Sequence, residues 1–257
     1  MSAWDPLLYL RYGDERTRAA RDLLAQVPVG DARLVYDLGC GPGNSTELLV
    51  RRFPGAKIVG IDGSDEMLAQ ARAILPEIDF HAADLRHWRP EQKADLLFAN
   101  AVFQWIPDHL DVFENLLNAL PPGGVLAVQM PDNLAEPAKV LMRTVAENGP
   151  RAEKLADVRQ ARQLLPAPEV YYDRLRPLCR SFDLWHTTYH HVLENAAAIV
   201  EWMTGSGLRP YLARLDAAEK KAYLDAYTAA VAAAYPPRTD GRVLLHFPRF
   251  FFVAVRG

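Results

Sequence analysis

Three glycines and one aspartate fall within a short segment near the start of the chain, Asp37-Leu-Gly-Cys-Gly-Pro-Gly43. A β-prone apolar run, 34–38, leads into the glycines, and a helix-like segment follows them. Glycine adopts backbone angles that other residues rarely reach, and it lets a ligand approach bare main chain. The segment therefore predicts a turn between a buried strand and a helix, with a ligand bound at the helix N-terminus.

The glycine spacing indicates what kind of ligand this turn would hold. A dinucleotide fingerprint requires Gly-x-Gly-x-x-Gly, whereas here the third glycine, Gly43, comes one residue early. Asp37 adds a carboxylate, which would repel a phosphate and attract a cationic group. We expect ligand contacts from Asp37, Gly39, Gly41 and Asn44, and we also expect Asn44 to cap the helix. The alternative is that the turn is only a tight connection.

A second acidic residue, Asp62, ends the predicted strand 57–62, about 20 residues beyond the glycine turn. A carboxylate in this position can accept hydrogen bonds from both hydroxyls of a ribose. Ser64 is a good N-cap for the next helix, and Met67 on that helix would contact an adenine ring. Alternatively, these residues only cap and stabilise the N-terminus of that helix.

Two more polar residues follow predicted strands. Asp84 comes after strand 78–83 and could accept the amino hydrogens of an adenine, while the backbone N–H of Leu85 donates to the ring. Asp84 could instead cap a helix. Asn100 ends strand 94–100. Because the carboxyl ends of parallel strands meet at one edge of a sheet, these residues and the glycine turn should form a single crevice.

Strand and helix patterns alternate five times up to residue 130, which predicts a parallel sheet with right-handed crossovers. We expect an α/β fold, a Rossmann-like, doubly wound, seven-stranded and mostly parallel sheet with helices on both faces. Residues 1–257 would form one domain with helical cap insertions at about 131–180 and 192–240. The last strand is apolar on both faces and should be central. We expect helices at about 14–27, 45–53, 109–120, 196–203 and 216–235, and strands at 57–62, 78–83, 94–100, 125–130, 182–191 and 244–255.

The composition favours a soluble protein with one sizeable core. The chain has 257 residues, 50% of them hydrophobic, and a formal net charge of −3, which predicts no general attraction to nucleic acid. Its two cysteines are too few for a disulfide framework and lack zinc-ligand spacing, so we expect a reducing compartment and no metal. No segment has the pattern of a targeting peptide or the length of a membrane span, so a cytoplasmic location is expected. The oligomeric state stays open.

Several cationic and aromatic residues could bind an anionic substrate. Arg16 falls on the apolar face of helix 14–27, where it either binds an anion or extends from the first turn into water. Arg209 precedes Pro210, which should hold it extended, and its guanidinium suits a carboxylate. Trp202 lies nearby in the sequence. The alternative for this pair is that Arg209 is an ordinary surface arginine and Trp202 an ordinary packed tryptophan. The weaker candidates are His190, His191 and Arg249.

Motifs spread over nearly the whole chain carry a family resemblance. They are Trp4-Asp5-Pro6 with Tyr9, Glu15-Arg16-x-Arg18, the glycine turn with Asn44-Ser45-Thr46, Asn100 with Gln104-Trp105, Gln129-Met-Pro-Asp-Asn133 and Thr204-Gly-Ser-Gly-Leu-Arg-Pro210. The glycine turn resembles the first motif of the class I S-adenosylmethionine-dependent methyltransferases. Together the motifs resemble the trans-aconitate 2-methyltransferase family.

This resemblance implies methyl transfer from S-adenosylmethionine to a carboxylate of trans-aconitate, giving a monomethyl ester and S-adenosylhomocysteine. A carboxylate is already ionised at neutral pH, so we expect positioning and desolvation and no catalytic acid or base. The hypothesis for the substrate pocket is Tyr9, Arg16, Gln104, Trp105, Trp202 and Arg209. Three rivals stay open: a methyltransferase of another carboxylate, such as a carrier-bound malonyl group, a nicotinamide oxidoreductase and a non-catalytic cofactor-binding regulator.

Overall fold

The computed structural model describes residues 13–159, 163–205 and 207–257, with side chains from Thr17 onward except that of Arg159. Its contacts divide the chain into two compact units. A sheet unit comprises Arg16–Pro131, Leu165–Thr187 and Arg249–Gly257, and a helical unit takes in Asp132–Leu164 and Thr188–Pro248. The single domain with two caps stays a prediction, although residues 165–180 of the first expected cap cluster with the sheet unit.

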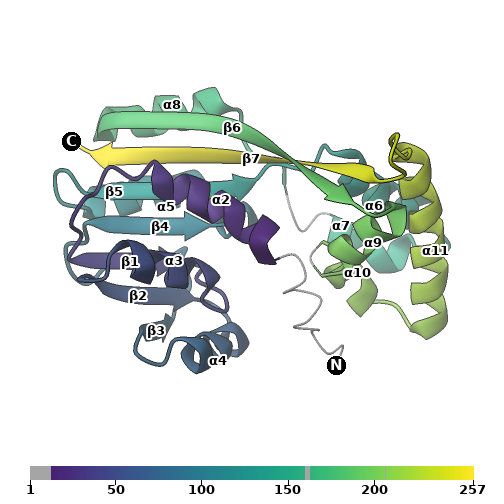
Figure 1. The fold of residues 1–257 in the computed structure, drawn as a ribbon, viewed down its shortest axis with the longest axis horizontal. Helices are drawn as coiled ribbons and strands as arrows, with labels where there is room; N and C mark the ends of the chain where they lie inside the picture. The colour runs from purple at the N-terminus through teal and green to yellow at the C-terminus, as the bar shows by residue number, and fades with distance from the viewer. Residues whose placement is uncertain (1–12, 160–162, 206) are drawn as a thin grey trace. The chain divides into compact units, whose positions relative to one another are not determined.

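The sheet has seven strands in the order β3-β2-β1-β4-β5-β7-β6 (Figure 1). Strands β1 to β5 are parallel, and β7 runs antiparallel to β5. This confirms the predicted fold class and the interior position of the last strand. The strand order turns back on itself between β1 and β4, which is where doubly wound folds bind ligands. The strands are β1 (Leu34–Leu38), β2 (Lys57–Asp62), β3 (Asp79–Ala82), β4 (Leu96–Asn100), β5 (Val125–Pro131), β6 (Cys179–Leu193) and β7 (Val243–Arg256).

Nearly all helical residues up to 119, and those at 168–178, belong to the sheet unit, and the remaining helices belong to the helical unit. All the predicted elements are present, with ends that differ by a few residues. Among the described residues, no helix is long and apolar enough to cross a membrane. The helices are α2 (Gly13–Ala25), α3 (Asn44–Arg52), α4 (Asp65–Ile74), η1 (Phe103–Trp105), α5 (His109–Ala119), α6 (Pro137–Asn148), η2 (Glu153–Leu155), α7 (Ala156–Arg159), α8 (Pro168–Leu175), η3 (Arg176–Leu178), α9 (Ala196–Thr204), α10 (Arg209–Ala213) and α11 (Ala217–Ala234).

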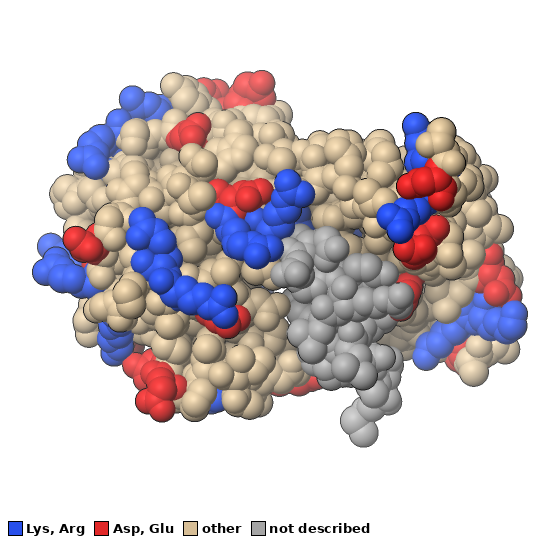
Figure 2. Space-filling view, viewed as in Figure 1, with Lys and Arg blue, Asp and Glu red and all other residues tan. Residues whose placement is uncertain are grey.

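Charged side chains of both signs are interspersed over the face shown in Figure 2. Charged residues of the described chain also form pairs one helical turn apart, such as Arg51 with Glu47 on α3 and Lys221 with Asp225 on α11. Exposed pairs of this kind contribute little to stability. Their main consequence is a mixed surface charge, in keeping with the small net charge of the sequence.

Strand register assigns the side chains of the sheet to two faces. Residues paired across neighbouring strands point to the same face, and successive residues alternate. Leu38 pairs with Ala99, Ala99 with Val128, and Val128 with Phe252, so these four share one face. All four belong to the main hydrophobic core. The opposite face carries the residues between them in the sequence.

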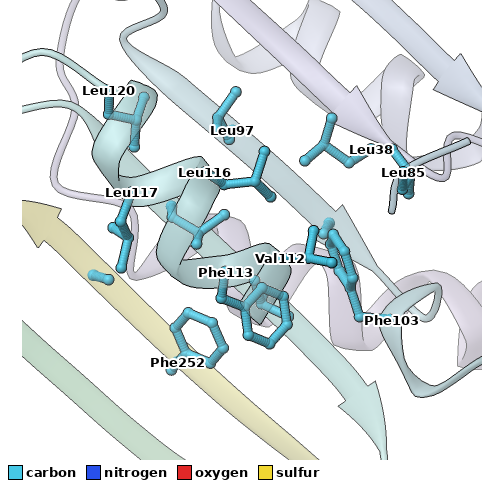
Figure 3. Packing of buried hydrophobic residues seen from close by; sticks show 14 of the residues in the cluster. Leu38, Leu85, Leu97, Phe103, Val112, Phe113, Leu116, Leu117, Leu120 and Phe252 are labelled. Atoms are coloured by element: carbon cyan, nitrogen blue, oxygen red, sulfur yellow. The ribbon is translucent and has the colours of Figure 1, made fainter. Parts of the chain in front are cut away.

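Helix α5 covers the apolar face of the sheet. Figure 3 shows Phe113, Leu116 and Leu117 of this helix directed toward the strands, near Leu97 and Phe252. The Phe113 ring meets the Phe252 ring edge to face, with ring centroids 5.1 Å apart. Burying several large side chains in this way is the main stabilising contribution in a domain of this size. The core therefore fixes the strands whose carboxyl ends carry the polar residues.

Close packing around Gly60 leads to a first prediction. A Cβ at this position of β2 would lie 2.4 Å from the Phe80 ring and 3.0 Å from the Cys40 sulfur. Overpacking of this kind typically costs about 1–3 kcal/mol. We expect Gly60→Ala to lower the free energy of unfolding by about that amount, measured by urea denaturation. Gly55→Ala is the control, because its Cβ would meet nothing within 4 Å; equal losses in the two variants would contradict this packing.

Candidate active site

Asp37 lies in β1 and is fully buried on the face of the sheet opposite the main core. Its Oδ2 atom accepts hydrogen bonds from the Ser45 hydroxyl at 2.8 Å and the Thr46 hydroxyl at 2.7 Å. Both donors belong to α3, so the carboxylate ties the strand to the helix across the glycine turn. The Oδ1 atom is also buried and has no hydrogen-bond partner among the described residues.

This environment changes the proton affinity of Asp37. Burial disfavours the charged form and raises the pKa of the carboxyl group to about 6, against the opposing effect of the Thr46 and Ser45 hydrogen bonds. The nearby charge of Asp62 also raises it. A buried carboxylate with an unsatisfied oxygen is a favourable neighbour for a cation.

Asp62 is held at the end of β2 by two backbone groups. Its Oδ2 accepts from the N–H of Gly41 and its Oδ1 from the N–H of Ser64, both at 2.9 Å. Each carboxylate oxygen has two lone pairs, so one per oxygen is left for a ligand. The carboxylate thus links the glycine turn to the start of α4 and still offers two adjacent acceptors, which suit a pair of neighbouring hydroxyls.

A cavity of about 550 Å³ opens beside Asp62 within the sheet unit. It combines residues from the carboxyl ends of β1, β2, β3 and β4, as the strand pattern predicts. Of the expected cofactor-binding residues, Gly39, Asp62, Asp84 and Leu85 line it. The cavity is lined by Gly39, Asp62, Gly63, Ala82, Ala83, Asp84, Leu85, Arg86, Val102 and Ile106.

Asp84 is exposed at the rim of this cavity and pairs with Arg86. The Arg86 Nε donates to both carboxylate oxygens, at 3.0 and 2.9 Å, and the Arg86 backbone N–H donates to Oδ1. These hydrogen bonds lower the pKa of Asp84 to about 2. A ligand amino group would therefore share the carboxylate with a guanidinium.

Two expectations about the neighbouring helix starts have different outcomes. Asn44 does not cap α3: the N-cap is Gly43, in the left-handed conformation with φ 96°, and Asn44 is the first helical residue. A left-handed residue turns the chain into the helix without a side-chain cap, which glycine permits at low cost. Ser64 does cap α4, accepting from the Met67 N–H at 3.4 Å. Met67 is half-buried and lies outside the set that lines the cavity.

The segment after β4 supplies residues that the sequence pattern does not reveal. Val102 and Ile106 line the cavity, although both look like ordinary apolar residues in the sequence. Between them and the strand, Ala101 has a φ of 58°, a conformation that costs a non-glycine residue on the order of 1–3 kcal/mol. Strain of this kind recurs at binding sites. The signal that could have found the segment is its position directly after Asn100.

Asn100 and Gln104 each have a buried side-chain oxygen without a hydrogen-bond partner among the described residues. Asn100 is the last residue of β4, and Gln104 belongs to η1. The Gln104 Nε2 donates to the Ala101 carbonyl at 2.6 Å, which holds the strained segment in place. Trp105, beside it, is 52% exposed. The polar atoms without partners mark this end of the sheet as a place for a ligand.

The other predicted substrate residues are not part of the described sheet unit's cavity lining. Tyr9 and the Arg16 side chain lie outside the described residues. Trp202 is 2% exposed in the helical unit, with its ring 4.7 Å from the ring of His191. Arg209 is exposed in the same unit. The prediction that Arg209 is extended is wrong, because it is the first residue of α10; Pro210 lacks an N–H but is tolerated in the first helical turn.

Comparisons with known proteins agree with this geometry. Residues 35–124 match a family described as a methyltransferase domain. A solved phosphoethanolamine N-methyltransferase 2 of Haemonchus contortus, in complex with S-adenosylhomocysteine, superposes with a TM-score of 0.57 at 16% identity over 93% of this chain and 53% of its own. The cyclase SpnF has the same fold, with a TM-score of 0.52 at 15% identity over 92% and 80%. The chain thus has a fold found among methyltransferases, and SpnF, a cyclase, illustrates that a fold does not decide the reaction.

Curated relatives are much closer in sequence. Proteins named trans-aconitate 2-methyltransferase are 59% identical in Afipia carboxidovorans and 57% identical in Azoarcus sp., each over 256 residues and 100% of both chains. A further one, from Rhizobium rhizogenes, is 54% identical over 99% of both chains. The chain belongs to the trans-aconitate 2-methyltransferase family.

The site fits the cofactor that a methyltransferase of this class requires. Asp37 Oδ1 is a buried acceptor without a partner among the described residues, and suits a cationic group. Gly41, with φ 54°, leaves open space where a side chain would stand. Asp62 offers two acceptors for hydroxyls. These acceptors thus suit a cationic group joined to a ribose.

The raised pKa of Asp37 gives a test of its burial. Its folded-state pKa of about 6 exceeds the ordinary value of 3.8, so ionisation costs the folded state stability as the pH rises through this window. Asp37→Asn removes that cost. Relative to wild type, we expect the variant to gain on the order of 3 kcal/mol of unfolding free energy between pH 4 and pH 7. Urea denaturation at several pH values measures the difference, with Asp65→Asn as an exposed control; a constant difference would contradict the assignment.

Asp62 is tested by ligand binding. Asp62→Asn replaces one acceptor oxygen with a donor and removes the charge, so we expect S-adenosylhomocysteine to bind roughly tenfold to hundredfold more weakly. Isothermal titration calorimetry measures the dissociation constant. Asp65→Asn serves again as the matched control, being an exposed aspartate in the first turn of α4. An unchanged dissociation constant in Asp62→Asn would refute the predicted ribose contact.

Proposed function

We propose that the chain transfers a methyl group from S-adenosylmethionine to a carboxylate of trans-aconitate, giving the monomethyl ester and S-adenosylhomocysteine. The observation that carries the proposal is the 54–59% identity, over essentially full length, to relatives named for this reaction. The cavity at the carboxyl ends of the strands, with Asp62 at its side, supports it. The protein would act on a small polycarboxylate.

The cofactor would be held by residues of the sheet unit. We propose that Asp62 accepts from the ribose hydroxyls, while Asp84 and the backbone of Leu85 bind the adenine. Asp37, Gly39, Gly41, Asn44 and Asn100 would surround the methionine part, where buried acceptors favour its positive charge. Met67 would contact the adenine from α4. Bound S-adenosylmethionine supplies an electrophilic methyl group: a C–O bond forms as the C–S bond breaks, and the electron pair stays on sulfur.

No proton has to move in this reaction. A substrate carboxylate has an ordinary pKa near 4 and is ionised at neutral pH, so the protein needs no general base. What the chain must supply is alignment, and holding two reactants in place can contribute on the order of 7–11 kcal/mol. It must also keep water from the attacking oxygen, since hydration weakens a nucleophile. The proposed roles of Tyr9, Arg16, Gln104, Trp105, Trp202 and Arg209 are therefore to bind and orient the acid.

Methyl transfer to a panel of acids tests the proposed function. The purified chain is incubated with S-adenosylmethionine carrying a labelled methyl group and with trans-aconitate, shorter dicarboxylates or a malonyl-loaded carrier protein. We expect label in a monomethyl ester of trans-aconitate, identified by mass, and equimolar S-adenosylhomocysteine. Preferential methylation of the malonyl carrier, or no transfer while S-adenosylhomocysteine still binds, would contradict the proposal.

Arg209 is the exposed cation among the proposed substrate residues with described side chains. Arg209→Ala should raise KM for trans-aconitate roughly tenfold or more, because a charge-assisted hydrogen bond to a carboxylate is lost. The KM for S-adenosylmethionine should stay within twofold, measured by steady-state kinetics. Arg242→Ala, another exposed arginine of the helical unit, is the control. Equal changes in the two KM values would count against this role.

A further inference from the structure

Gln129 and Arg249 form a buried polar pair in the sheet unit. Gln129 of β5 is completely buried, and Arg249 of β7 is 4% exposed. The Arg249 Nη1 donates to the Gln129 Oε1 at 3.1 Å. The other end of the amide, Gln129 Nε2, is buried and has no hydrogen-bond partner among the described residues.

The hydrogen-bonding chemistry of this pair suits an anion. A guanidinium has five N–H donors and no acceptor, and the Gln129 Nε2 adds two more donors. The Gln129 oxygen is already used by Arg249, so its amide group is oriented with the nitrogen available to a ligand. A buried donor without a partner is costly, and each such group in a native structure needs an explanation. A carboxylate bound beside both groups would supply it.

The strand register places this pair at the ligand-binding edge of the sheet. Gln129 pairs with Asn100 on one side and with Phe251 on the other, so the Asn100 and Gln129 side chains share a face. Arg249, two residues from Phe251, also points to that face. The Gln129 carbonyl accepts from the Ala101 N–H at 2.9 Å, next to Val102 of the cavity.

Donors and acceptors are separated along this face. On β1 and β4, the buried atoms without partners are carboxylate and amide oxygens, from Asp37 and Asn100. On β5 and β7 the polar groups are the donors of Gln129 and Arg249. Neighbouring strands lie about 4.8 Å apart, so the outermost members, Asp37 on β1 and Arg249 on β7, lie three strand spacings or roughly 14 Å apart, the length of a small molecule. A cation is favoured at one end of the row and an anion at the other.

We propose that Gln129 and Arg249 bind a non-reacting carboxylate of the polycarboxylate substrate. This inference rests on the proposed function and adds a specificity-determining site to it. Burial of the pair keeps water away from the bound carboxylate and strengthens its attraction to the guanidinium. The residues thereby favour acids with a second or third carboxylate over simpler acids.

Gln129→Glu is the sharpest variant, because it keeps the shape of the side chain and puts a carboxylate beside Arg249. The new internal anion should take the place of the substrate's carboxylate and repel it. Loaded with S-adenosylhomocysteine, the variant should bind trans-aconitate roughly a hundredfold more weakly than wild type, measured by calorimetry. Its affinity for S-adenosylhomocysteine should stay within twofold. Gln92→Glu, at an exposed position, is the control for the added charge.

Arg249 is tested by two variants and by a change of substrate. Arg249→Met removes the guanidinium at similar length, and Arg249→Lys keeps the charge but not the planar fork. We expect KM for trans-aconitate to rise most in the first and less in the second. Wild type should prefer trans-aconitate over a dicarboxylate lacking one carboxymethyl group, and this preference should fall at least tenfold in Arg249→Met.

The outcomes separate this inference from the proposed function. If wild type does not methylate trans-aconitate, the proposed function fails, while acid binding to the loaded protein still tests the pair. Selective loss of acid binding in the Gln129 and Arg249 variants supports the inference. Wild-type acid affinity in these variants overturns it. A loss of S-adenosylhomocysteine binding as large as the loss of acid binding also overturns it. So does unfolding of both Arg249→Lys and Gln129→Glu, because the pair would then only hold the sheet together.

Discussion

The parallel pairing of β1 with β2 and β4 is the constraint on which the site depends. Because these strands run in the same direction, their carboxyl ends meet, and the chain leaves each of them at the same edge of the sheet. Asp62 then joins two of these ends by accepting from the Gly41 and Ser64 backbone groups. The cavity exists because loops that are distant in the sequence are fixed beside each other.

The same edge of the sheet carries several features that lower the stability of the fold. Asp37 is ionised in a buried position at a cost that its raised pKa expresses, and Ala101 has a strained backbone. Asn100, Gln104 and Gln129 each keep a buried polar atom without a partner among the described residues. A protein selected for stability alone would remove such features. Their concentration at one edge is physically reasonable if a charged ligand satisfies them.

The proposed chemistry explains why the sequence contains no conspicuous catalytic residue. Carboxylate methylation needs no acid or base, so selection acts on the arrangement of charges and the exclusion of water. The mixed surface charge in Figure 2 is consistent with a small-molecule substrate. A carrier protein, which is acidic, would favour a basic docking surface. Affinity for the acid would then depend on buried groups.

Much of the sheet and of the cavity at its edge was determined by the sequence itself. Glycine spacing predicted the turn, and apolar runs predicted the parallel sheet. The acids after the strands predicted that Asp62 and Leu85 lie at the cavity. Each of these is a local pattern with a local cause. The sequence could not reveal that Gly43 rather than Asn44 is the N-cap of α3, since a left-handed backbone replaces a side-chain cap. Nor could it reveal that Arg86 forms an ion pair with the Asp84 carboxylate, or that Arg209 is helical. The lining of the cavity by Val102 and Ile106 was equally hidden. Only the tertiary structure pairs Gln129 with Arg249, 120 residues apart, because strand register is set by the packing of the whole sheet.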